Sequence, residues 1–135
     1  MLVLIEMGSC MSLKNQNSNT GVEPVFSVSG KTALFLRQYN ALPSSSAPSY
    51  PAAIETLVRK YGLKTLADNT LALCGFVRTD SLFTPTPFTE RGITFAPPIG
   101  DQRTTCIPLT QLHFFFTQPH ILYFETSMPV LPMNE

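Results

Sequence analysis

The sequence predicts a small single-domain α+β protein, in which a short helical hairpin is followed by proline-rich antiparallel strands or extended segments. Its 135 residues are enough for one domain with a hydrophobic core. Helical periodicity is confined to residues 33–75, and proline-interrupted alternating segments follow in residues 76–126. Because the helices precede the strands instead of alternating with them, α+β is favoured over α/β.

Composition divides the chain into three parts. We expect an N-terminal strand and polar arm in residues 1–32, the α+β domain in residues 33–126, and an irregular apolar tail in residues 127–135. Residues 1–5 are apolar but too short for the hydrophobic region of a signal peptide. Residues 14–22 are rich in Asn, Ser and Gly, which is typical of a loop or a disordered arm.

A lipidation pattern lies close to the N-terminus. Residues 7–12 (MGSCMS) match the pattern for N-myristoylation, with Cys10 placed for a second acyl chain. The reaction requires a free glycine amine, and Gly8 is internal in this chain. Membrane attachment is therefore expected only if translation starts at Met7, and stable anchoring would also require acylation of Cys10.

The segment Ser29-Gly30-Lys31-Thr32 lies between a predicted strand (25–28) and a predicted helix (33–42), as a phosphate-binding loop does. The nucleotide-binding pattern places its first glycine at position 25, where this chain has Val25. Without that glycine the flexible cradle of backbone N–H groups is missing. We therefore expect no nucleotide cofactor, and we interpret Ser29 or Thr32 as the N-cap of the helix.

Residues 49–76 contain the predicted helical hairpin. The first helix begins at Pro51, which is favourable in a first turn, and ends at Gly62. Its apolar stripe has helical spacing and consists of Ile54, Leu57, Val58 and Tyr61. The second helix is expected to begin at a Thr65-x-x-Asp68 capping box and to end at Gly75. The two apolar faces should pack against each other.

A helix, a short turn and a second helix also describe a DNA-binding motif, but the charges exclude that function. The second predicted helix exposes Asp68 and Asn69 where base-reading or phosphate-binding cations are needed. Over the whole chain, 9 basic and 9 acidic residues cancel. We therefore expect no nucleic-acid partner and no electrostatic attraction to an anionic membrane.

Extended structure is predicted in the C-terminal half. Residues 82–88 suit a proline-containing edge segment, and residues 92–96 suit a strand that is closed by a turn at 97–101. Two further strands are expected at Gln111–Thr117 and His120–Thr126.

An uncharged run of membrane-spanning length covers residues 104–124. Polar side chains and the helix-breaking Pro108 and Pro119 interrupt it, so we favour strands over a membrane helix.

The three cysteines, Cys10, Cys74 and Cys106, are an odd number without a close pair. Such a pattern does not resemble a disulfide framework and predicts free thiols in a reducing compartment. We therefore expect an intracellular, cytoplasmic protein.

The expected function is a non-catalytic protein–protein interaction or accessory module with an aromatic C-terminal surface. Few charged residues and many phenylalanines predict that some apolar surface stays exposed for a protein partner or for self-association. The residues expected to form that surface are Phe114, Phe115, Phe116, Tyr123 and Phe124.

The alternative is a small-ligand-binding protein or a thiol enzyme that uses Cys106, His113 and His120, which are spaced seven residues apart. A structural metal site needs a close pair of ligands, and the sequence has neither C-x-x-C nor H-x₃₋₅-H. No third group can be assigned to orient a catalytic thiolate. We therefore expect no metal and no cofactor, and we favour the non-catalytic function.

Overall fold

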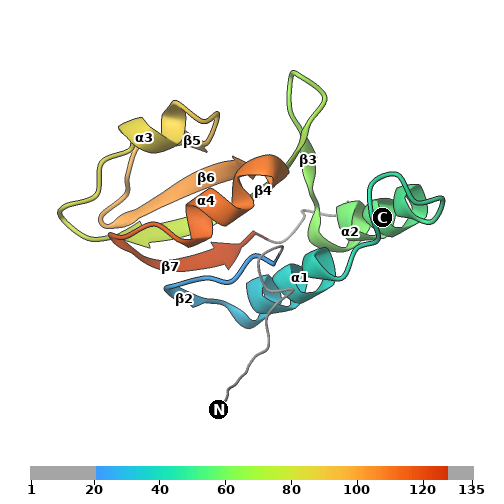
Figure 1. Ribbon diagram of the computed structural model, residues 1–135. Coiled ribbons are helices and arrows are strands. Elements are labelled where there is room, and N and C mark those ends of the chain that lie inside the picture. Colours follow the sequence, from blue (N-terminus) through green and yellow to red (C-terminus); the bar gives the residue numbers. More distant parts are fainter. Residues whose placement is uncertain (1–20, 128–135) are drawn as a thin grey trace, which may run out of the picture.

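The computed structural model describes residues 21–127, and in that range it forms four α-helices and a mixed six-stranded sheet (Figure 1). The predicted α+β class is therefore confirmed. The expectations for the apolar N-terminus, the myristoylation pattern and the C-terminal tail fall on residues 1–20 and 128–135, outside the described residues. Among the residues that are described, no helix has the length and apolarity needed to cross a membrane.

The strands are arranged around a long central strand, β4. The sheet order is β2-β7-β4-β6-β5, and β3 pairs with one end of β4. Only β2 and β7 are parallel; the other pairs are antiparallel. The strand bounds are Ser27–Val28 (β2), Lys64–Thr65 (β3), Leu71–Thr79 (β4), Thr94–Phe95 (β5), Gln102–Pro108 (β6) and Ile121–Thr126 (β7).

The helices cover one face of the sheet and one of its sides. Figure 1 shows α4 lying across a face of the sheet, while α1 lies beside β2 and β7 and α2 lies further out, next to α1. α1 contacts both β7 and α2. The helix bounds are Gly30–Asn40 (α1), Tyr50–Tyr61 (α2), Thr86–Thr89 (α3) and Leu112–Phe116 (α4), with a 3-10 turn at Leu109–Gln111 (η2) before α4.

The start of α1 is attached to β7 by buried hydroxyl groups. The Ser29 side chain accepts a hydrogen bond from the Thr32 N–H at 3.2 Å, which confirms Ser29 as the N-cap. The buried Thr32 hydroxyl accepts a hydrogen bond from the Thr126 N–H at 2.9 Å and lies 2.7 Å from the Thr126 hydroxyl. The segment from Ser29 to Thr32 thus joins the helix to the sheet.

Replacing Thr32 with valine is expected to lower the free energy of unfolding by about 1–3 kcal/mol. The change preserves the shape but leaves the buried N–H and hydroxyl of Thr126 without this partner. Urea-induced unfolding measures the effect. The control is Thr56→Val, because the Thr56 hydroxyl bonds only to the Ala52 carbonyl on an exposed surface of α2. Equal losses for the two variants would contradict the proposed role of Thr32.

The first predicted helix of the hairpin is confirmed as α2. Pro51 lies in its first turn, and Gly62 ends it in the left-handed conformation with φ 65°. Its helical partner is α1, not a following helix. The two helices meet where the Tyr61 ring packs edge-on against the Phe35 ring, with 5.1 Å between their centroids.

The second predicted helix of the hairpin is wrong, because β3 and β4 form a β-hairpin in that region. The Asp68 carboxylate accepts hydrogen bonds from the N–H and the hydroxyl of Thr70, at 3.1 and 2.6 Å, and so stabilises a turn. Asn69 then reverses the chain with φ 70°, a conformation that asparagine tolerates well. Asp68 therefore stabilises the hairpin turn and caps no helix.

The predicted strand at His120–Thr126 is confirmed as β7, but the strand expected at Gln111–Thr117 is wrong. Those residues form the end of η2 and α4, because Leu112, Phe115 and Phe116 have helical spacing and all are buried.

The predictions for three short segments between residues 82 and 101 have different outcomes. Residues 82–88 were expected to be extended but lead into α3, which buries Phe88. The strand expected at 92–96 is confirmed as β5. The predicted turn at 97–101 is also observed, with Gly100 at φ 65°.

The folded unit extends further towards the N-terminus than residue 33. Val22 is buried, and its backbone N–H and carbonyl both bond to the Asn40 side chain, at 2.8 and 3.0 Å. Residues 22–32, which we assigned to an N-terminal strand and arm, therefore contribute to the core through Val22 and to the sheet through β2.

Candidate binding groove

The predicted aromatic surface is mostly part of the core. Phe115, Phe116 and Phe124 have no exposed surface, because α4 presses the first two against β7. Phe114 is half-buried and carries the Arg91 guanidinium 3.9 Å above its ring centroid. Phe115, Phe116 and Phe124 therefore cannot contact a partner while the chain keeps this fold.

Tyr123 lies on the opposite face of the sheet from Phe124. It is half-exposed and stands opposite Arg78 of β4. Of the predicted aromatic set, Tyr123 is thus the residue that belongs to the uncovered face.

Cys106, His113 and His120 do not form a common site. Cys106 is bonded to Cys74 in a disulfide, so the expectation of free thiols is wrong for these two residues. His113 is exposed on α4, and His120 pairs with Asp80. Within residues 21–127, no three His, Cys, Asp or Glu side chains are grouped as metal ligands.

The disulfide joins residues that are directly opposite each other on β4 and β6. Register alone brings them together, since they are 32 residues apart in the sequence. Closing a loop of that length in the unfolded chain stabilises the fold by about 3–4 kcal/mol in the chain-entropy model. The thiol enzyme considered above requires a thiolate that Cys106 lacks while this bond is intact. Cys10 lies outside the described residues.

His120 and Asp80 form a pair at the start of β7. The His120 Nδ1 atom lies 3.0 Å from Asp80 Oδ2, and the Asp80 N–H donates to the His120 carbonyl at 3.0 Å. His120 has φ 74°, an unusual conformation for a residue other than glycine. The hydrogen bond from His120 is the main reason that the pKa of Asp80 is lowered, and the Leu82 N–H adds to it.

Asp80→Asn is expected to reduce stability near neutral pH and to have little effect in acid. A carboxyl whose pKa is lowered by folding stabilises above its unfolded-state pKa, and that contribution is lost as pH falls through the folded pKa. Thermal unfolding measured from acidic to neutral pH tests the prediction. His120→Asn should change the pH dependence of stability in the same way, because asparagine tolerates a positive φ but has no imidazole. Parallel profiles for wild type and Asp80→Asn would contradict the assignment.

The opposite face of the sheet is uncovered by the described residues. On β4, Leu73 and Val77 point into the core with no exposed surface, whereas Phe76 is 39% exposed. Side chains alternate along a strand, so Cys74, Phe76 and Arg78 share the uncovered face. In register beside them, β6 contributes Cys106, Thr104 and Gln102.

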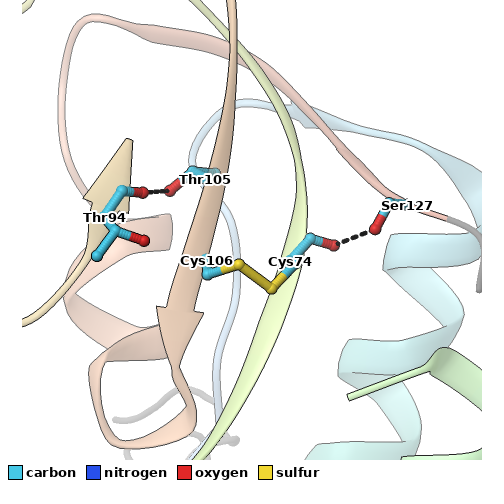
Figure 2. The surroundings of a disulfide bond; sticks show 5 residues. All are labelled: Cys74, Thr94, Thr105, Cys106 and Ser127. Atoms are coloured by element: carbon cyan, nitrogen blue, oxygen red, sulfur yellow. Dashed lines mark hydrogen bonds between the residues drawn. A yellow bond between two sulfur atoms is a disulfide. The ribbon is translucent and has the colours of Figure 1, made fainter. Parts of the chain in front are cut away.

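A groove of about 600 Å³ crosses this uncovered face from β3 to β5. A second hollow of about 240 Å³ continues from it and shares Phe76. We call the two together the sheet groove. Its lining includes Lys64, Cys74, Phe76, Thr94, Cys106 and Ser127. Figure 2 shows the disulfide on its floor, with Ser127 on the Cys74 side and Thr94 on the side of β5.

The sheet groove is apolar at one end and has a cation, Lys64, in its larger part. Ile99, which is 85% exposed, lines the smaller hollow together with Phe76. Arg103 borders the smaller hollow through its backbone, because it pairs with the buried Val77 and its guanidinium lies 5.3 Å from the ring centroid of Phe83 on the core face. The lining hydroxyls have no histidine or carboxylate beside them in the groove.

Sequence reasoning missed the groove because it depends on strand pairing that the sequence does not reveal. The available signal was the alternation from Leu73 to Arg78, which marks one buried and one partly exposed set of side chains. Comparison of this chain with protein-family models, with curated proteins and with solved structures finds no match.

Proposed function

We propose that this chain is a non-catalytic protein-interaction module that binds an extended segment of a partner protein in the sheet groove. The observation that carries the proposal is the hollowed, uncovered sheet face with Phe76 exposed at its centre. The groove volume is in the range of ordinary ligand sites. Exposed apolar side chains that gather beside a hollow are characteristic of a binding face.

An extended segment fits the shape of the groove. Its floor is formed by β4 and β6, and its walls are formed by β3 and β5. β5 ends the sheet order, so its outer edge has backbone groups that pair with no described strand. A strand that pairs along this edge places every second side chain on the same side of the sheet as the groove.

The lining defines the chemistry of the partner segment. Phe76 and Ile99 favour apolar side chains at alternate positions. Lys64 favours an acidic residue at the larger end of the groove and disfavours a basic one there. The proposed partner is therefore an extended, apolar segment that carries at least one carboxylate.

Selection of random peptides on the purified oxidised protein tests this proposal. Enriched peptides should combine alternate apolar residues with an acidic residue. The selected peptides should bind Phe76→Thr at least about tenfold more weakly than they bind wild type. A tenfold loss of affinity corresponds to about 1.4 kcal/mol. Threonine suits this position because it faces Thr104 of β6 and favours strands.

Leu122→Thr is the matched control, because Leu122 is 48% exposed on β7 but does not line the groove. Its affinity for the selected peptides should be unchanged. Lys64→Glu should shift the preference from acidic to basic peptides. The proposal is wrong if no peptide is enriched, if Phe76→Thr binds as wild type does, or if light scattering shows a dimer that Phe76→Thr converts to a monomer.

A further inference from the structure

We propose that the Cys74–Cys106 disulfide is a thiol–disulfide exchange site for a peptide-sized thiol, with Cys106 as the sulfur attacked and Lys64 beside the departing thiolate of Cys74. This chemistry is separate from the binding of a partner segment, which concerns the oxidised protein. It uses the position of the disulfide in the groove and the register of the strands around it.

Access to the sulfur atoms is the first requirement. Both cysteines are half-buried, and both line the larger part of the sheet groove. A volume of about 600 Å³ accommodates a small peptide. Exposed disulfides are those that exchange readily, whereas shielded ones resist reduction.

The surroundings distinguish the two sulfur atoms. An attacking thiolate approaches along the line of the S–S bond, from beyond the sulfur that it attacks. Beyond Cys74 lies Ser127, whose N–H and hydroxyl both donate to the Cys74 carbonyl, at 3.1 and 3.0 Å. Figure 2 shows Ser127 on the Cys74 side of the disulfide, and we infer that its bonded backbone restricts the approach of a thiol from that side.

Beyond Cys106 the groove lining continues over residues 94–96. Thr94 of β5 stands opposite Cys106 in the register, so a small side chain is the neighbour on that side. A thiol that lies over β5 is therefore in line with the Cys106 sulfur. The geometry points to Cys106 as the residue that forms the mixed disulfide.

The leaving sulfur is adjacent to a cation. Lys64 pairs with Ala72, two residues before Cys74, so its side chain is on the same face and diagonal to Cys74. Diagonal neighbours in a sheet are about 7–8 Å apart, which a lysine side chain can span. The ammonium group therefore stabilises negative charge that develops on the Cys74 sulfur.

The reaction balances with two molecules of thiol. The first thiolate forms a bond to the Cys106 sulfur, and the S–S electron pair leaves with Cys74, which water then protonates. A second thiolate attacks the mixed disulfide and releases Cys106 as a thiolate. Two thiols are oxidised to one external disulfide, and the protein disulfide is reduced to two cysteines.

The fold does not depend on the disulfide alone to hold β4 against β6. The strands pair continuously from Ala72–Pro108 to Arg78–Gln102. Leu73 and Ile107, which pair directly beside the disulfide, are fully buried on the other face. The ladder and the core therefore keep the two thiols opposite each other after reduction, ready to be oxidised again.

The test uses the oxidised full-length chain carrying Cys10→Ser, so that no third thiol can exchange. Reduced glutathione is added without denaturant, free thiols are alkylated at intervals, and the products are mapped by mass spectrometry. We expect the mixed disulfide on Cys106 and the alkylated thiol on Cys74. The rate should not change with low concentrations of urea.

Lys64→Gln should slow the exchange by about fivefold, the effect of losing one favourable charge interaction in water. Arg59→Gln is the charge-matched control, because Arg59 is exposed on α2 and pairs with Glu55; its rate should equal that of wild type. The proposal is overturned if the adduct forms on Cys74, if Lys64→Gln exchanges at the wild-type rate, or if exchange accelerates steeply with urea. The last result would mean that the disulfide opens only in unfolded molecules.

Discussion

Replacing Phe115 with alanine is expected to lower the free energy of unfolding by about 3–5 kcal/mol. The side chain has no exposed surface, so its loss leaves a cavity that the rigid sheet on one side cannot fill. Its ring also makes edge contacts that would be lost. These contacts are with Phe26, Phe88, Phe116 and Phe124.

Phe76→Ala is the matched control for Phe115→Ala. The same atoms are removed, but Phe76 is 39% exposed and faces the groove. We expect a loss of about 1 kcal/mol or less. Urea unfolding of both variants separates a core role from a surface role. If Phe115→Ala were as stable as wild type, Phe115 would not belong to the core. The interpretation of residues 114–116 as a contact surface, which the sequence alone suggested, would then be favoured.

Gly75→Ala is expected to destabilise the protein by about 3 kcal/mol, near the upper end for overpacking. Gly75 lies in the middle of β4, where it pairs with Thr126 of β7 and Thr105 of β6. A Cβ atom at this position would collide with the Glu125 carbonyl oxygen and would lie 2.7 Å from the Phe124 ring. Because the first obstacle is backbone, β7 would have to move away from β4.

The control is Gly30→Ala, which adds the same methyl group where nothing lies within 4 Å. Gly30 is the first residue of α1, and alanine there restricts the unfolded chain without strain. We expect a stability equal to that of wild type or higher by up to about 1 kcal/mol. Thermal unfolding compares the two. Similar stabilities for both variants would show that β4 and β7 are not in close contact at Gly75.

α2 was predictable because all of its local signals agree. Its apolar stripe has helical spacing, Pro51 suits the first turn, and Gly62 suits the left-handed end. The exposed pair of Glu55 and Arg59 has the favourable order and bonds at 3.0 Å. No tertiary contact was needed to identify this helix.

The following segment was misinterpreted because its pattern fits two structures. Leu66, Leu71 and Cys74 have a spacing that a helix allows, and Thr65-x-x-Asp68 resembles a capping box. The decisive signal was Asp68-Asn69, a pair that favours tight turns through its side-chain bonds and its tolerance of positive φ. β4 lies between β7 and β6, and its core face is formed by Leu73, Gly75 and Val77.

The opposite error occurred at residues 111–117. A run of phenylalanines has a high strand propensity, and this outweighed the helical spacing of Leu112, Phe115 and Phe116. The same error placed Phe115 and Phe116 in the predicted contact surface. Both residues belong to α4, whose packing against the sheet instead buries them in the core.

The candidate groove could not be predicted from the sequence, for a physical reason. The groove and the disulfide both depend on the pairing of β4 with β6, which are separated by more than twenty residues of turns and short elements. The two cysteines have no characteristic spacing, and they meet only because the register places Cys74 opposite Cys106. The hydrophobic pattern of a strand restricts its register, but it does not identify which distant strand is the partner.

The most direct test of the central claim is to locate a selected peptide on the isotope-labelled, oxidised protein by amide chemical shifts. The largest shifts should occur along β4, β6 and β5, at residues that line the groove, such as Phe76, Thr94 and Thr104. In Phe76→Thr, the peptide concentration that gives half of these shifts should rise by about tenfold or more. Shifts confined to α2 or α4, or saturable binding that leaves the groove residues unperturbed, would contradict the account.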